Sequence, residues 1–149
     1  MTFDGDYAPS QWDWVRDQVE LYERSGGTEG TTFLDTGLPV VIVTMWGHRS
    51  GKVRKVPVMR VEHDGAYAII GSKGGDPKDP AWVANLRARP DEVRLQDGPD
   101  VMDVAVRELD DGPERDEWWR RAVAAYPPYE EYQAATARRI PVFVTSRRD

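Results

Sequence analysis

The sequence has 149 residues, a common size for a single domain, and its 40% hydrophobic and 31% charged residues are typical of a globular protein. The absence of cysteine excludes disulfides and Cys-ligated metals, two histidines offer little for another metal site, and a net charge of −6 argues against a nucleic-acid partner. No run approaches the roughly 18 apolar residues of a membrane-spanning helix, and the first ten residues lack the basic and apolar regions of a secretion signal, so we expect a cytoplasmic protein.

Residues 10–24 are expected to form an amphipathic helix, because apolar residues recur there at helical spacing between charged ones. Ser10 is the expected N-cap, and Gly26 with Gly27 is the expected stop. The polar face is mostly acidic, whereas helices that lie on membranes carry Lys and Arg there. We therefore expect this N-terminal part, residues 1–38, to pack on the rest of the protein, with peripheral membrane contact as the alternative.

Three antiparallel strands are expected to follow. Residues 39–46 (PVVIVTMW) form a β-branched run typical of a buried strand, and a turn over residues 47–51 leads into a return strand over residues 53–61. A second turn leads into residues 67–71. Pro57 cannot donate a ladder hydrogen bond, so it confines the return strand to an edge or a bulge.

The rest of the chain alternates short helices with strands. Residues 72–79 (SKGGDPKD) read as a glycine loop, and Asp79 with Pro80 is expected to open a helix that Pro90 ends. The further expected elements are a hairpin of residues 93–96 and 101–109, a helix from residue 113 broken at 126–128 and resumed over 129–137, and a closing strand over 140–145. The predicted fold class is mainly β (α+β), with about six antiparallel strands that close into a barrel.

One segment of this acidic chain is basic. No Asp or Glu occurs between Asp35 and Glu62, yet the segment holds six cationic or titratable side chains. The ordinary interpretation is a solvated hairpin edge whose cations deter edge-to-edge pairing. The functional interpretation is a site for a small polyanionic ligand. The six residues are His48, Arg49, Lys52, Arg54, Lys55 and Arg60.

The surroundings of this segment favour phosphate. A strand, the sequence G-H-R-S-G-K-V-R, a second strand, S-K-G-G and the start of a helix follow in order, so that backbone N–H groups and cations are concentrated. Glycines let the backbone approach an anion, and Arg49 and Arg54 can donate two hydrogen bonds each. The pattern matches neither a Walker loop nor a G-x-G-x-x-G fingerprint. Two ordinary turns are the alternative.

Four ordered motifs resemble those of the deazaflavin-dependent nitroreductase family of actinobacteria. They are G-x-x-S-G-x-x-R-x-x-P at residues 47–57, S-K-G-G at 72–75, P-x-W-x-x-N-L at 80–86 and Y-P-x-Y-x-x-Y-Q at 126–133. The resemblance implies that residues 39–149 form a split β-barrel related to FMN-binding split barrels. It also implies coenzyme F420, whose phosphodiester and polyglutamate tail are anionic.

The resemblance places cofactor contacts on particular residues. The phosphate and tail contacts are His48, Arg49, Ser50, Gly51, Lys52, Arg54 and Lys73, and the ring contacts are Ile70, Gly71, Ser72, Ala81, Trp82, Asn85 and Tyr129. Two positions depart from close relatives, because His48 stands where they have Arg and Val56 where some have Asn. We therefore expect the affinity for the F420 tail and the hydrogen bonds to its ring to differ from those of the close relatives. Without its motif, Trp82 would read as a core anchor.

Tyr126, Tyr129 and Tyr132 are three residues apart, so they share one helical face. Without other information, a row of aromatic residues on one helical face more often belongs to the hydrophobic core than to a functional site. In the resembling enzymes the matching tyrosines close over the deazaflavin and line the acceptor pocket. A phenol there can orient the acceptor and stabilise developing negative charge. Tyr129 is the first choice for this role, and Ser72 completes the candidate catalytic set.

The resemblance implies an F420-dependent oxidoreductase that passes hydride to a planar organic acceptor, such as a quinone, an activated enone or a nitroaromatic. An organic cofactor also suits a chain without cysteine or a metal cluster. One alternative is an FMN-dependent oxidoreductase on the same barrel. Another is a non-catalytic carrier of F420 or a lipid-like ligand. We expect a monomer or weak dimer.

Overall fold

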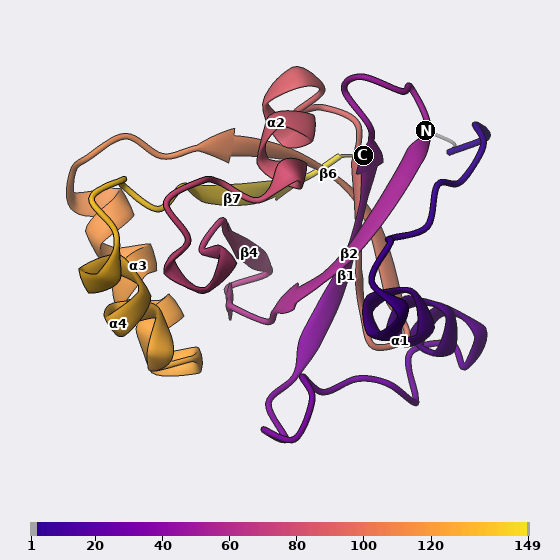
Figure 1. Cartoon of the computed structure of the whole chain (residues 1–149), viewed down its shortest axis with the longest axis horizontal. Coiled ribbons are helices and arrows are strands. Elements are labelled where there is room, and N and C mark those ends of the chain that lie inside the picture. The colour runs from indigo at the N-terminus through magenta and orange to yellow at the C-terminus, as the bar shows by residue number, and fades with distance from the viewer. Residues whose placement is uncertain (1–2, 149) are drawn as a thin grey trace.

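The computed structural model describes residues 3–148, and residues 1, 2 and 149 of the two expected parts lie outside this range. An antiparallel sheet of seven strands curls into a half-barrel in the order β2-β1-β5-β6-β7-β4-β3, and four α-helices and one 3-10 helix surround it (Figure 1). The strands are β1 (Val40–Trp46), β2 (Val53–Met59), β3 (Glu62–His63), β4 (Ala66–Ile70), β5 (Val93–Asp97), β6 (Asp100–Glu108) and β7 (Val142–Arg147). The helices are α1 (Asp13–Arg24), η1 (Lys73–Gly75), α2 (Ala81–Ala88), α3 (Pro113–Ala125) and α4 (Pro128–Ala135).

The architecture confirms the predicted α+β fold of antiparallel strands. β2 is an edge strand, which explains how Pro57 is accommodated opposite Ile42. The prediction missed β3, because its two residues are too short to produce a sequence pattern. β3 pairs only with the start of β4, so the sheet ends there in a very short edge.

Side-chain alternation along the strands divides the apolar residues into two clusters. The inner cluster lies inside the half-barrel, where Val41, Val43 and Met45 of β1 point, and β2 contributes Val56 and Val58 at its margin. The second cluster, which we call the outer cluster, lies between the opposite face of the sheet and helices α1, α3 and α4. Figure 1 shows α1 beside β1 and β2, and α3 with α4 at the far end of the molecule near β7.

The start of α1 differs from the prediction. The helix begins at Asp13, after Trp12 in an extended conformation, and the Ser10 hydroxyl accepts the N–H of Trp12 (3.1 Å) instead of capping the helix. The predicted stop is confirmed, since Gly26 and Gly27 have φ of +66° and +80°, values that L side chains avoid. None of the helices within residues 3–148 is long and apolar enough to cross a membrane.

Three further boundaries also need correction. Asp79 does not cap α2, because its carboxylate accepts a hydrogen bond from Arg138 (3.0 Å). α4 ends at Ala135 rather than at residue 137, and β7 begins at Val142 rather than at 140. The segment between them is held by Gln133, whose amide oxygen accepts the N–H of Ile140 (3.0 Å) and whose amide nitrogen donates to the Arg138 carbonyl (2.8 Å).

Candidate functional site

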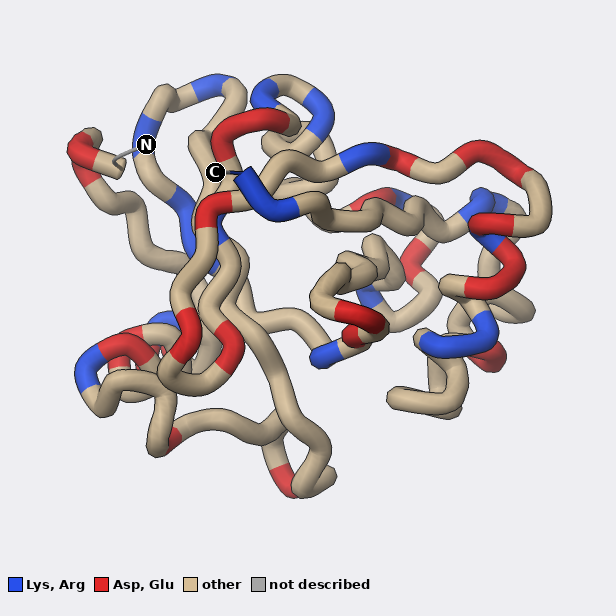
Figure 2. Tube along the Cα trace, turned by 180° about the vertical axis from the view of Figure 1, so that it is seen from behind, with Lys and Arg blue, Asp and Glu red and all other residues tan. Residues whose placement is uncertain are grey.

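The basic segment separates into two sets of side chains. Lys55 pairs with Glu23 of α1 (2.7 Å), and Arg60 pairs with Asp97 (2.9 Å). The remaining three cations form no ion pair or hydrogen bond through their side chains with any residue in the described range 3–148. In Figure 2 the tube between β1 and β2 carries blue segments and no red. We call this set the cation turn, and its members are Arg49, Lys52 and Arg54.

Strand geometry explains why Arg54 and Lys55 differ. Successive side chains of a strand point to opposite faces, so Arg54 shares a face with Val56 and Val58, whereas Lys55 points to the face covered by α1. The turn itself is tight at Gly47, where a Cβ would lie 2.7 Å from the Ser50 hydroxyl oxygen and 3.4 Å from Cγ of Arg54. A side chain at this position would have to displace the Ser50 hydroxyl and would crowd the Lys52 carbonyl oxygen (3.2 Å), so the tight turn favours glycine.

Asn85 of α2 holds the turn in place. Its side-chain oxygen accepts the backbone N–H of His48 (2.9 Å) and lies 2.7 Å from the His48 Nδ1, which places the imidazole proton on that nitrogen. Asn85 is buried, whereas His48 is exposed. The resemblance implies a ring contact for Asn85, and the structure shows that its oxygen is already engaged in fixing the turn.

The S-K-G-G loop lies where β4, α2 and α4 meet. A Cβ on Gly71 would lie 2.9 Å from Val83 of α2, and a Cβ on Gly75 would lie 2.8 Å from the carbonyl oxygen of Tyr132 of α4. The glycines therefore permit close contact with both helices. Ser72 is half-buried, and Lys73 is exposed with its Nζ 4.0 Å from Asp76.

Arg138 is a residue of this region that sequence analysis missed. Its guanidinium donates to the carbonyl oxygens of Gly71 (3.1 Å), Ser72 (2.7 Å) and Asp76 (2.7 Å), and to the Asp79 carboxylate (3.0 Å). Its partners are 59 to 67 residues away along the chain, so no local spacing could reveal it. A single side chain thus binds the whole loop.

The three tyrosines differ in burial. Tyr129 is 4% exposed and packs against Tyr126, with ring centroids 5.0 Å apart, and its hydroxyl has no hydrogen-bond partner among residues 3–148. Tyr126 and Tyr132 are half-buried, and their hydroxyls lie 2.9 Å apart. Burial and this hydrogen bond raise the pKa of Tyr126 to about 12, and burial raises the pKa of Tyr129 as well. Tyr126 and Tyr129 are therefore neutral phenols at physiological pH.

The remaining predicted ring contacts are not all equally accessible. The Ile70 side chain is buried in the outer cluster with Tyr129, so only its backbone can face a ligand. Trp82 is half-buried and packs against the inner cluster, as Val56 and Val58 do. Ala81, at the first position of α2, is exposed.

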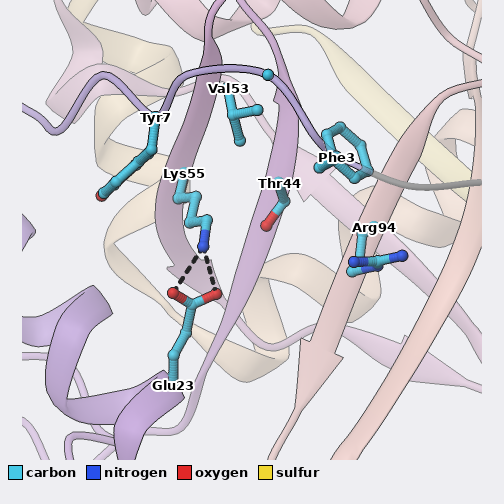
Figure 3. A pocket seen from close by; sticks show the side chains of 8 residues that line it. Phe3, Tyr7, Glu23, Thr44, Val53, Lys55 and Arg94 are labelled. Carbon is cyan, nitrogen blue, oxygen red and sulfur yellow. Dashed lines mark hydrogen bonds and ion pairs between the residues drawn. The ribbon is translucent and has the colours of Figure 1, made fainter.

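One pocket of about 140 Å³ lies on the opposite face of β1 and β2 (Figure 3). The N-terminal segment passes over it with Phe3 and Tyr7, and the Lys55–Glu23 ion pair lies inside it. None of the predicted site residues lines this pocket. The cation turn and the tyrosines therefore belong to a different surface.

Comparison with known proteins identifies the family. The F420H(2)-dependent quinone reductase family matches residues 14–147, which is nearly the whole chain. The chain belongs to this family. An F420H(2)-dependent quinone reductase of Mycobacterium tuberculosis is 32% identical over 112 residues, which cover 74% of each chain.

Solved structures agree with this assignment. A structure titled F420-H2 dependent reductase is 54% identical, with a TM-score of 0.68 over 72% of this chain and 94% of that one. A structure titled domain-swapped dimer is 51% identical, with a TM-score of 0.70 over 92% of this chain and all of that one. A general-stress-protein relative from Clostridium acetobutylicum, described as of the pyridoxinephosphate oxidase family, shares 15% identity at a TM-score of 0.51, over 88% of this chain and 85% of that one, and shows the fold alone.

Membership confirms the expected reductase class, and coenzyme F420 is the cofactor of the family. The residues fit such a group. Free cations on the turn suit the anionic tail of F420, and three of them are more than the single phosphate of FMN would need. The apolar margin formed by Val56, Val58 and Trp82 suits a planar ring.

Proposed function

We propose that this enzyme holds F420 along one continuous surface and reduces a quinone there. The cation turn binds the phosphate and tail, and Ser50 and Gly51 of the same turn supply short polar contacts. The loop of residues 71–73, with Trp82 and Ala81, borders the ring. The proposal rests on the cation turn, where three cations have no side-chain partner among residues 3–148 and the buried Asn85 holds the backbone of the turn at His48.

Reduced F420 supplies a hydride, and the protein supplies position and hydrogen bonds. The hydroxyl pair of Tyr126 and Tyr132 is half-buried, so it can reach an acceptor beside the ring. When one hydroxyl donates to the other, the second retains a proton for an acceptor oxygen. A donor at that oxygen stabilises the negative charge that hydride addition creates. Tyr129 supports the pair from behind by packing, and Ser72 is a further donor at the loop.

A quinone carbonyl, an enone carbonyl and a nitro group all present an oxygen to such a donor on a flat apolar body. We propose quinones as the preferred acceptors and enones and nitroaromatics as weaker ones. The preference follows from the second quinone carbonyl, which offers the tyrosine pair a partner in either orientation.

The direct test is a turnover assay with reduced F420 and menadione, followed by the returning absorbance of oxidised F420. We expect oxidation at least about a hundredfold faster than without protein, since general catalysis by position and one donor gives that much. Benzoquinone, cyclohexenone and a nitroimidazole extend the comparison. If F420 binds but no acceptor is reduced, the chain is a carrier and the proposal fails.

The oligomeric state determines whether the proposed F420 surface is open to solvent or covered by a second copy of the chain. One relative is titled a domain-swapped dimer. We propose that the present chain is a monomer or weak dimer, because its half-barrel already buries both apolar clusters within one chain. Light scattering at several concentrations measures this directly, and a stable dimer at low micromolar concentration would contradict it.

A further inference from the structure

Arg138 is half-buried, with 14% of its side chain exposed, and it binds four oxygens within residues 71–79, which include the S-K-G-G loop. Three of these oxygens are backbone carbonyls. A guanidinium has five N–H donors in a fixed plane, so this arrangement determines the orientation of the peptide groups that it contacts. A simple ion pair with Asp79 would not require the three carbonyls.

The direction of the carbonyls fixes the direction of the next N–H groups. All peptide bonds in the described range are trans, and in a planar trans peptide the C=O and N–H point in opposite directions. With the Gly71 and Ser72 carbonyls on Arg138, the N–H groups of Ser72 and Lys73 point away from it. Neither N–H has a hydrogen-bond partner among residues 3–148.

The loop needs an external constraint to hold this shape. Lys73 has φ of +45°, in the left-handed region that non-glycine residues rarely adopt because it brings Cβ too close to the following carbonyl oxygen. Such a conformation persists where surrounding contacts over-determine it. Arg138 supplies contacts on both sides of Lys73, through Ser72 and Asp76.

Arg138 is in turn tied to the tyrosine helix. Gln133 of α4 donates to the Arg138 carbonyl (2.8 Å) and accepts the Ile140 N–H (3.0 Å). The same short segment therefore connects α4, which carries Tyr129 and Tyr132, to the loop that carries Ser72 and Lys73. A shift of α4 would therefore also move the loop of residues 72–75.

We propose that Arg138 is a positioning residue of the F420 site, which directs the Ser72 and Lys73 N–H groups toward the cofactor and keeps the loop in register with the tyrosine helix. The inference rests on the proposed function. It adds a residue outside all four sequence motifs to the cofactor site.

The test compares Arg138→Lys and Arg138→Met with Arg139→Lys. Arg139 is the adjacent residue and pairs with the exposed Asp111 (2.8 Å), so it is a matched control for charge and place in the chain. The measurements are titration with oxidised F420 by fluorescence, the absorption spectrum of the bound cofactor, and a thermal melt. All titrations are done well below the melting temperature of each variant.

We expect Arg138→Met to weaken F420 binding about tenfold to a hundredfold. Without the guanidinium the loop is no longer held in one conformation, and we expect this to cost as much affinity as the loss of one or two charge-assisted hydrogen bonds. The bound spectrum should move toward that of free F420, because the ring loses its directed N–H groups. Arg138→Lys keeps the charge and should lie between Met and the parent. Arg139→Lys should match the parent in affinity and spectrum.

Unchanged affinity and spectrum in Arg138→Lys and Arg138→Met would overturn the inference and leave the proposed function standing. Weaker binding with a parental bound spectrum would also overturn it, because stability alone would then explain the loss. If Arg138→Met does not fold, Arg138→Lys decides. Failure of the parent to bind F420 would remove the proposed function and this inference together.

Discussion

The hydroxyls of the three tyrosines at the end of α3 and on α4 differ in their surroundings. Tyr129 is buried and its hydroxyl is without a partner in the described part of the chain, whereas Tyr126 and Tyr132 form a half-buried pair. An acceptor can approach the pair without entering the core. We therefore assign the donor role to the pair and a packing role to the Tyr129 ring.

Replacing Tyr126 or Tyr132 by Phe should lower turnover of menadione by about ten- to a thousandfold, in line with the loss of one transition-state donor. F420 affinity and melting temperature should stay near the parental values, because the ring is retained. Steady-state assays beside thermal melts measure both.

Tyr129→Phe is the matched control. It removes a hydroxyl that has no hydrogen-bond partner among residues 3–148 and keeps the buried ring, so turnover should stay within about twofold and stability should change little. A large loss of turnover in Tyr129→Phe, with Tyr126→Phe and Tyr132→Phe near parental, would return the donor role to Tyr129.

Sequence spacing predicts that the three tyrosines share one helical face, but Tyr126 lies in the break between α3 and α4, and spacing does not predict how deep each ring lies. Depth is set by contacts such as that of Tyr129 with Trp119 of α3 (6.3 Å between ring centroids). The basic segment shows the same limit. Its charge can be read from the sequence, but Glu23 and Asp97, which pair with Lys55 and Arg60, lie 32 and 37 residues away along the chain.

At the scale of elements, α1 is joined to the sheet by one buried tyrosine. The Tyr22 hydroxyl accepts the N–H of Gly98 (2.7 Å) and donates to the carbonyl of Val40 (3.1 Å). Gly27 approaches Gly98 so closely that a Cβ on Gly27 would lie 1.8 Å from its carbonyl oxygen. The end of α1 and the β5–β6 turn therefore form one packed unit.

Tyr22→Phe should lower the free energy of unfolding by about 1–3 kcal/mol, because it leaves a buried N–H and a carbonyl without their partner. F420 affinity should not change, since α1 packs on the face opposite Arg54. Chemical denaturation and F420 titration measure the two effects. Tyr7→Phe, at a 41% exposed position, serves as the control with little expected effect.

Most helices and strands could be predicted from the spacing of apolar residues and from turn residues, but the residues at which they begin and end could not. Asp79 has the residue type of a helix cap, yet Arg138 takes its carboxylate, so a distant contact overrides a local preference. Ser10 likewise bonds before the helix begins. β3 lies just before the predicted turn that leads into β4, and its two residues pair with Tyr67 and Ala66, so it is too short for a strand pattern to reveal it.

At the scale of the whole molecule, tyrosines are placed in many parts of the packing. Burial raises the pKa above the ordinary value of a phenol for five of the six. They occur in the N-terminal segment, α1, the inner cluster, the end of α3 and α4. The five are Tyr7, Tyr22, Tyr67, Tyr126 and Tyr129.

These shifts predict a loss of stability in alkali. Below pH about 10 the phenols are protonated in both the folded and the unfolded chain, so their contribution is complete. Above that pH the unfolded chain releases protons that the folded chain retains, and the free energy of unfolding falls by up to about 1.4 kcal/mol per pH unit for each buried or half-buried tyrosine, and by less for Tyr7, which is 41% exposed. Denaturation between pH 8 and 11 measures the slope. Stability that stays level to pH 11 would contradict the burial of these groups.

The central claim is that the cation turn binds F420, and fluorescence titration of four proteins with F420 at low and high salt tests it most directly. Arg49→Ala and Arg54→Ala should each lose about 1.5–3 kcal/mol of binding free energy, and the parental affinity should fall with salt. Lys55→Ala, one position along the same strand but paired with Glu23 on the other face, should bind as the parent does. Equal affinity in Arg54→Ala and the parent, or a loss confined to Lys55→Ala, would contradict the account.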